Sequence, residues 1–166
     1  MKKLILLFSL IIVAGCIQAQ TTPVGMPPYR ILTTDSVYVT PANLKHHKTM
    51  LVYFAPDCPH CQHLTVELKE KMKQLGDTQI IMITWSANYD IRAIKNFVRD
   101  YDLKKYPNII VGTEGYTSLV MKYFNVQTTP YVAVYNSDKK LIKGYSKSPD
   151  IDSLIAVVKS ADKKKT

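Results

Sequence analysis

The chain has 166 residues, of which 46% are hydrophobic and 21% charged, a composition typical of a globular protein with one hydrophobic core. This composition excludes a disordered chain and a membrane-spanning protein. The formal net charge is +9, yet the basic residues are spread along the chain and form no basic stripe with interleaved aromatics. Because nucleic-acid binding needs such a stripe, we expect no nucleic-acid partner.

The first residues are typical of an export signal. Lys2 and Lys3 give a positive start, and residues 4–14 form an apolar run that only Ser9 interrupts. The run is too short to span a bilayer as a stable helix. We therefore predict that residues 1–15 direct the protein out of the cytoplasm, to the periplasm or cell envelope.

Two processing sites compete after this signal. Val13-Ala14-Gly15-Cys16 is similar to the bacterial lipobox, in which the cysteine is lipidated and becomes the new N-terminus. The alternative is ordinary cleavage after Ala19, which places Ile17 where a small side chain is normal. We favour lipidation of Cys16, which would hold the protein to the membrane by a lipid anchor.

Residues 16–35 are predicted to be a spacer, residues 36–160 one folded domain, and residues 161–166 a basic, solvated tail. The spacer is polar and contains three prolines that exclude a regular helix: Pro23, Pro27 and Pro28.

Within the domain, short apolar runs alternate with segments of helical spacing. The clearest helix runs from Pro59 to Leu75, where apolar residues recur at steps of three and four and Gly76 ends the pattern. The last helix is predicted to start at Ser148-Pro149, with a cap and a first-turn proline. The predicted strands are 37–39, 51–54, 80–85, 108–111, 131–135 and 141–145, and the other helices are 91–101 and 116–124.

From residue 51 onward the order of these elements is β-α-β-α-β-α-β-β-α, preceded by the short strand 37–39. Such an order implies an α/β fold, a mixed sheet covered by helices on both faces.

The three cysteines are an odd number, which in an exported protein calls for an explanation. If Cys16 is lipidated or removed, Cys58 and Cys61 remain. An isolated, closely spaced pair of cysteines in an oxidising compartment is more often redox-active than a structural disulfide. A disulfide between Cys58 and Cys61 would also close so short a loop that it would add little stability. The pair predicts redox chemistry.

The residues around this pair resemble the thioredoxin superfamily. Residues 51–61, ending in Cys58-Pro59-His60-Cys61, are similar to its active-site strand and turn. Residues 125–130, ending in Thr129-Pro130, are similar to its proline loop. The helix–strand–helix between residues 88 and 124 resembles the longer central segment of the TlpA/ResA group, exported thiol–disulfide oxidoreductases. The resemblance covers residues 36–160 and implies a thioredoxin-like fold.

The position of Cys58 gives it the role of nucleophile. It falls where a strand passes into a helix, so its sulfur should lie near the free N–H groups of the first turn, which stabilise a thiolate. Cys61 lies nearly one turn further on and deeper, where it can resolve a mixed disulfide. Pro59 fits the first helical position, where its missing N–H costs nothing.

Two neighbours are expected to tune this pair. A protonated His60 would lower the pKa of Cys58, and the negative charge of Asp57 would oppose that effect. The Cys-Pro-His-Cys tetrad is that of DsbA-like oxidases, whereas the TlpA/ResA-like remainder is typical of reductants. The direction of electron flow therefore stays open.

The resemblance also implies a role for Thr129 and Pro130. In thioredoxin-like folds the bond before this proline is cis, the loop faces the active-site disulfide, and the residue before the proline offers its backbone to an extended substrate. Thr129 and Pro130 are therefore predicted to bind substrate.

The chain departs from thioredoxin at Val52, where thioredoxin has a buried aspartate that accepts the proton of the buried thiol. Asp57 also replaces the tryptophan that precedes the first cysteine of thioredoxin. Asp57 and Glu67 are both open as the proton acceptor for Cys61.

A zinc site is the main alternative at these residues, since Cys58, His60, Cys61 and His63 are all metal-ligand types. A structural zinc site draws ligands from a second, distant segment, and four ligands on one helical turn point to different sides. We expect no metal and no cofactor other than the Cys58–Cys61 disulfide.

The sequence thus predicts an exported oxidoreductase that exchanges disulfides with protein thiols, more as a reductant than as an oxidase. A reductant would need an electron donor, for which a membrane thiol-transfer protein is expected. The alternatives are a DsbA-like oxidase, a thioredoxin-fold binding module without turnover, and a peroxidase, which would need an isolated cysteine in its own motif.

Overall fold

The computed structural model describes residues 25–45, 47–85 and 90–161. The predicted export signal, Cys16 and the first part of the spacer lie outside these residues, as do tail residues 162–166. Across the described ranges, no helix combines the length and the apolar character that crossing a membrane requires.

The described chain builds one seven-stranded mixed sheet in the order β2-β1-β5-β4-β3-β6-β7. Its strands are β1 (Ile31–Thr33), β2 (Tyr38–Val39), β3 (Thr49–Tyr53), β4 (Gln79–Thr84), β5 (Ile109–Thr113), β6 (Tyr131–Tyr135) and β7 (Leu141–Tyr145). The central strands β3, β4 and β5 are parallel, and the outer strands pair antiparallel with their neighbours. Parallel neighbours need crossover connections, which the helices between these strands provide.

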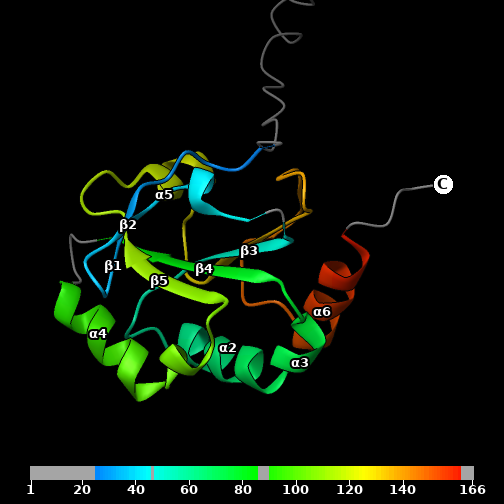
Figure 1. Cartoon of the computed structure of the whole chain (residues 1–166), viewed down its shortest axis with the longest axis horizontal. Helices are drawn as coiled ribbons and strands as arrows, with labels where there is room; N and C mark the ends of the chain where they lie inside the picture. The colour runs from blue at the N-terminus through cyan, green and yellow to red at the C-terminus, as the bar shows by residue number, and fades with distance from the viewer. Residues whose placement is uncertain (1–24, 46, 86–89, 162–166) are drawn as a thin grey trace, which may run out of the picture.

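Helices cover both faces of the sheet (Figure 1). α2 (Pro59–Glu70), α3 (Met72–Leu75), α4 (Ile91–Asp100) and α6 (Ile151–Ser160) lie on one face. The short α5 (Leu119–Tyr123) and the residues just before β1, Met26 and Tyr29, cover the other. Two 3₁₀ turns, η2 (Pro41–Asn43) and η3 (Leu103–Lys105), complete the described elements. The predicted α/β fold, a mixed sheet with helices on both faces, is confirmed.

Two hydrophobic cores follow from the alternation of side chains along the strands. In and just after β3, Val52 and Phe54 face α2, α4 and α6, whereas Leu51 and Tyr53 face the α5 side. The ring of Phe54 packs on that of Phe97 in α4, with centroids 4.9 Å apart. Every residue of β3 is buried, as a central strand covered on both faces requires.

Folded structure begins earlier than predicted. β1 lies inside the range assigned to the spacer, 16–35, and pairs with β5. Tyr29 and Ile31 are 1% and 0% exposed and belong to the core on the α5 side. A three-residue strand after prolines carries too little periodicity to be identified from sequence, because its burial depends on β5, about eighty residues away in the chain.

The start of the last helix also differs from the prediction. Asp150, and not Ser148, is the N-cap of α6, and its carboxylate accepts a hydrogen bond from the Ser153 N–H at 2.9 Å. Pro149 therefore precedes the cap instead of lying in the first turn. Asp and Ser are comparable caps, so composition alone does not distinguish them.

Two other predicted helices have different bounds in the structure. The segment from Pro59 to Leu75 is interrupted at Lys71, which separates α2 from α3. α5 is shorter than the predicted 116–124.

Gly112 allows β1 to approach β5 closely. A Cβ at this position would lie 2.7 Å from the carbonyl oxygen of Leu32, which is backbone and cannot move aside without shifting β1. We expect Gly112→Ala to lower the free energy of unfolding by about 1–3 kcal/mol, measured by urea denaturation. Gly25→Ala is the matched control, since its Cβ would meet the Tyr123 hydroxyl at 3.9 Å. Equal midpoints for the two variants would contradict the steric argument.

Candidate active site

The pairing of β3 with β6 brings two distant segments of the chain together. Tyr53, the last residue of β3, pairs with Tyr131, the first residue of β6. Thr129 and Pro130 precede β6 and so lie where the chain leaves β3 toward the cysteines. The Thr129–Pro130 bond is cis, and the Cys58 thiol donates a hydrogen bond to the Thr129 carbonyl oxygen, with Sγ and O 3.5 Å apart.

A tight turn places Cys58 at the start of α2. The Cys58 N–H donates to the Ala55 carbonyl at 3.1 Å, and the Cys58 carbonyl accepts the N–H of Gln62 at 3.0 Å, which starts the helical ladder. Cys58 is the N-cap of α2 and Pro59 its first residue, the position predicted from sequence. The Gln62 side chain closes the turn with a 3.0 Å hydrogen bond from Nε2 to the Pro56 carbonyl.

The Cys58 thiol is partly exposed and has a lowered pKa. Burial raises its pKa, but hydrogen bonds to the sulfur from the Cys61 backbone, the Cys61 thiol, the Thr129 side chain and the His60 backbone outweigh burial, so the pKa lies below the ordinary thiol value. Donors at the first turn of a helix favour the charged form of a group in front of them. Cys58 is therefore the thiol of the pair that more readily becomes a nucleophile.

Cys61 has the opposite character. Its side chain is 1% exposed and packs in the core on the α2 side. Burial, the main cause, raises the pKa of this thiol to about 12. Both cysteines are free thiols in the structure. One thiol of the pair is thus partly exposed with a lowered pKa, and the other is buried with a raised pKa.

The predicted tuning residues lie around Cys58. The side chains of His60 and Asp57 are exposed, and the contribution of His60 to the lowered pKa of Cys58 comes from its backbone. Asp57 lines a hollow of about 660 Å³ between the turn and α4, together with Gln62 and Tyr101.

The two candidates for the proton acceptor of Cys61 lie on the surface side of this region. Glu67 faces His63 along α2, with Oε1 and Nε2 3.6 Å apart. Val52, in the place of the thioredoxin aspartate, is buried in the apolar core. The groups that act on the pKa of Cys61 are the Ala55 backbone, Cys58 and Thr129.

Metal-ligand side chains do not converge within the described part of the chain. No group of three or more His, Cys, Asp or Glu residues there is arranged to hold a metal ion.

A cleft of about 420 Å³ opens at the proline loop, where the Thr129 carbonyl accepts the Cys58 thiol proton. Its lining consists of Tyr53, Trp85, Met121, Val126, Gln127, Thr128 and Thr129. Trp85 ends the predicted strand 80–85, and its side chain stacks on the Tyr53 ring, with centroids 5.7 Å apart and planes 7° apart. It also forms part of the cleft. The signal for this second role is its place just after β4, since clefts form at the carboxyl ends of parallel strands.

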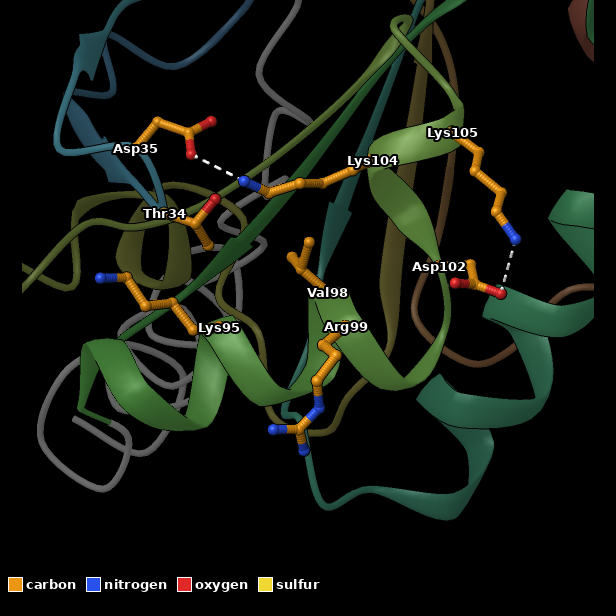
Figure 2. Close-up of a pocket in the computed structure, with 8 residues that line it drawn as sticks. All are labelled: Thr34, Asp35, Lys95, Val98, Arg99, Asp102, Lys104 and Lys105. Carbon is orange, nitrogen blue, oxygen red and sulfur yellow. Dashed lines mark hydrogen bonds and ion pairs between the residues drawn. The ribbon is translucent and has the colours of Figure 1, made fainter.

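A separate hollow of about 670 Å³ lies among α4, η3 and the turn after β1 (Figure 2). Lys104 pairs with Asp35, and Lys105 with Asp102, each at 3.0 Å. Four basic side chains line this hollow, and two of them pair with its two carboxylates.

Comparisons with known proteins agree with this geometry. The family model for a thioredoxin-like domain matches residues 39–159. A protein disulfide-isomerase of Ricinus communis is 27% identical over 89 residues, which are 54% of this chain, and the chain spans 18% of that protein's length.

Two solved structures illustrate the similarity of fold. A secreted disulfide oxidoreductase of Mycobacterium tuberculosis, homologous to DsbE of E. coli, has a TM-score of 0.66 at 18% identity, over 80% of this chain and 96% of that one. A Sco protein of Arabidopsis thaliana, solved with copper bound, has a TM-score of 0.64 at 18% identity, over 82% of this chain and 97% of that one. Since the family model covers most of the chain, from β2 to α6, the chain belongs to the thioredoxin-like domain family.

Proposed function

We propose that the protein is a thiol–disulfide oxidoreductase that reduces disulfides of protein substrates through Cys58 and Cys61. The observation that carries this proposal is the asymmetry of the pair. Cys58 is partly exposed with a lowered pKa, whereas Cys61 is buried with a pKa raised to about 12. A binding module without turnover has no need of two thiols in such different states.

The proposed reaction starts with the Cys58 thiolate. It attacks one sulfur of the substrate disulfide, the substrate S–S bond breaks, and the released substrate thiolate takes up a proton. Cys61 then loses its proton and attacks the Cys58 sulfur, which breaks the mixed disulfide and releases the second substrate thiol. Two electrons have passed to the substrate, and the protein holds a Cys58–Cys61 disulfide. The Thr129 carbonyl oxygen lies 3.5 Å from Sγ of Cys58, which supports the proposal that the Thr129 backbone aligns an extended substrate.

Export and membrane anchoring complete the proposal. The basic and apolar start of the chain and the lipobox-like Val13-Ala14-Gly15-Cys16 support export with a lipid on Cys16. The resemblance to the TlpA/ResA group supports a membrane thiol-transfer protein as the donor that reduces the Cys58–Cys61 disulfide again. Mass spectrometry of the mature N-terminus tests the anchor, and a mature chain that begins at Gln20 without lipid would refute it.

Oxidation of substrates is the second candidate. It is favoured by the lowered pKa of Cys58, because a stabilised thiolate stabilises the reduced protein and makes the disulfide more oxidising. The tetrad Cys58-Pro59-His60-Cys61 supports the same direction.

The equilibrium redox potential distinguishes the two directions. For a reductant we expect a value near that of thioredoxin, about −270 mV, measured against glutathione buffers with the exchange followed by alkylation. A value near that of DsbA, about −120 mV, would overturn reduction and favour oxidation. Cys61→Ser is the control, since it cannot form the internal disulfide and can be oxidised only to a mixed disulfide with glutathione, which is recognised by its added mass.

A further inference from the structure

We propose that the edge of β5 beyond β1 is a docking site for an extended, acidic segment of a partner protein, which would add to the sheet as a further strand. The site goes beyond the proposed disulfide exchange, because it lies away from the thiols. Cys58 follows the carboxyl end of β3, whereas this edge lies along the amino-terminal half of β5. Since β3, β4 and β5 are parallel, the thiols and the docked segment occupy opposite ends of these strands.

β1 covers only one half of the β5 edge. It pairs with Gly112 and Thr113, whereas residues Ile109, Ile110 and Val111 pair with β4 alone among the described strands. The carbonyl just before β5, that of residue 108, and the N–H just after it, that of residue 114, both bond to β4. Because backbone direction alternates along a strand, the Val111 N–H and the Ile109 C=O point to the uncovered side. Peptide groups at a strand edge are a template for pairing with another chain.

A groove of about 370 Å³ follows this edge. Ile109, Ile110 and Val111 all line it, although consecutive side chains of a strand point to opposite faces of the sheet. Val98 of α4 lines it from one face of the sheet, and Val39 of β2 belongs to the core on the other face. A space that touches neighbours on both faces lies at the edge itself, where an added strand would be.

The groove offers apolar contacts over the length of a short strand. Most of the side chains that line it are apolar, and Val37 at its rim is 56% exposed. Three residues of an extended segment span about 10 Å, which matches the three uncovered residues of β5. Strand addition combines such side-chain contacts, which give specificity, with main-chain hydrogen bonds, which give affinity. The groove therefore fits a segment with three consecutive apolar residues.

The charge beside the groove favours an acidic partner. The groove continues into the hollow of Figure 2, and four residues line both. These residues are Thr34, Asp35, Val98 and Lys104. The lining of the hollow has four basic side chains and two carboxylates, a net formal charge of +2, and Arg99 also pairs with Asp100 outside it. Lys95 forms no ion pair with any described residue. Carboxylates next to the apolar residues of the docked segment would complement this charge.

The charge of this chain argues against its own residues as the occupant. Residues 1–24 contain Lys2 and Lys3 and no acidic side chain, and residues 162–166 contain three lysines and one aspartate. A second copy of the chain would bring a formal net charge of +9 to a basic surface. A separate protein with an acidic segment is the occupant that complements the rim.

The test measures how fluorescein-labelled peptides without cysteine bind to the purified protein, by fluorescence anisotropy. The acidic peptide has valine, isoleucine and valine flanked by two glutamates on each side, and the basic peptide has lysines in place of the glutamates. We expect the acidic peptide to bind about 10-fold or more tightly than the basic one. N-methylation of its three apolar residues removes backbone donors and should weaken binding about 5-fold or more.

Two outcomes of this comparison would overturn the proposal. Equal binding of the acidic and basic peptides, or no binding of either, would refute the acidic partner. Equal binding of the acidic peptide and its N-methylated form would refute strand addition.

Variants then locate the binding. Val37→Asp should weaken binding of the acidic peptide about 10-fold or more, because apolar contact is lost and a negative charge is added. Val66→Asp is the matched control, since this valine of α2 is 41% exposed, and it should leave the Kd unchanged. Lys95→Glu should weaken binding about 2- to 5-fold, with the exposed Lys147→Glu as its control. Equal effects of the groove variants and their controls would overturn the location.

Hydrogen exchange of the Val111 amide, followed by NMR, identifies the occupant. In the free protein this amide should exchange readily at every protein concentration and become protected when the acidic peptide is added. Protection that rises with protein concentration would assign the edge to a second copy. Protection in the free protein at every concentration would assign it to this chain's own residues. Either of these two results would overturn the proposal of a separate partner.

Discussion

Cys61→Ser is expected to turn the protein into a trap for its substrates, whereas Cys58→Ser is expected to abolish the reaction. In Cys61→Ser the Cys58 thiolate still attacks, but no second sulfur is present to resolve the mixed disulfide. In Cys58→Ser the remaining thiol is 1% exposed with a pKa raised to about 12, so it neither reaches a substrate nor ionises at neutral pH. The loss of turnover should reach the uncatalysed background in both variants.

The measurement is non-reducing electrophoresis of envelope extracts, together with insulin reduction by the purified proteins. Mixed-disulfide bands that are sensitive to dithiothreitol should appear with Cys61→Ser and be absent with Cys58→Ser. The opposite pattern would assign the nucleophile to Cys61. Cys58→Ser with insulin reduction equal to that of the wild type would refute the role of the pair altogether.

The second large effect is a difference in alkylation rate between the two thiols. Iodoacetamide reacts with the thiolate, whose fraction falls about tenfold for each pH unit below the pKa. The pKa of Cys58 lies below the ordinary value and that of Cys61 is raised to about 12. At pH 7 the thiolate fraction of Cys58 should therefore exceed that of Cys61 by more than about three orders of magnitude.

The two rates are measured separately, for Cys58 in Cys61→Ser and for Cys61 in Cys58→Ser, between pH 5 and 10. The rate for Cys58 should rise with pH and level off below the pH at which an ordinary thiol does. The rate for Cys61 should still be rising at pH 10. Denatured samples, in which both are ordinary exposed thiols, are the control, and native profiles equal to the denatured ones would contradict the electrostatic argument.

The sequence predicted the parts of this protein that local patterns control. β3, the turn and α2 follow one another within a short stretch, so the apolar run, the cysteines and Pro59 together predicted that Cys58 lies at the start of a helix. The same holds for the hairpin of β6 and β7, whose strands flank a polar turn. The side of each strand that meets each helix follows from the alternation of residues such as Val52 and Tyr53.

What the sequence could not supply depends on contacts between distant residues. β1 is a strand because Ile31 is buried against the rest of the sheet, and its own residues carry no sufficient pattern. Glu114 follows a strand, and its sequence context is that of an ordinary polar loop residue. Its hydrogen-bond partner Tyr53 is 61 positions earlier, so no local pattern predicts their contact. The cleft over Trp85 was missed for the same reason, because its lining comes from four separate segments.

The division of the thiol site between two segments that lie 71 residues apart has a consequence for the newly made chain. In an unfolded copy of this protein neither the Thr129 contact nor the aligned N–H groups of α2 exist, so Cys58 and Cys61 are ordinary thiols of similar reactivity. The pKa of the Cys58 thiol is lowered only once β3 has paired with β6 and α2 has formed. The lowered pKa of Cys58 therefore depends on folding, so this thiol becomes more reactive than an ordinary cysteine only when the protein itself is complete.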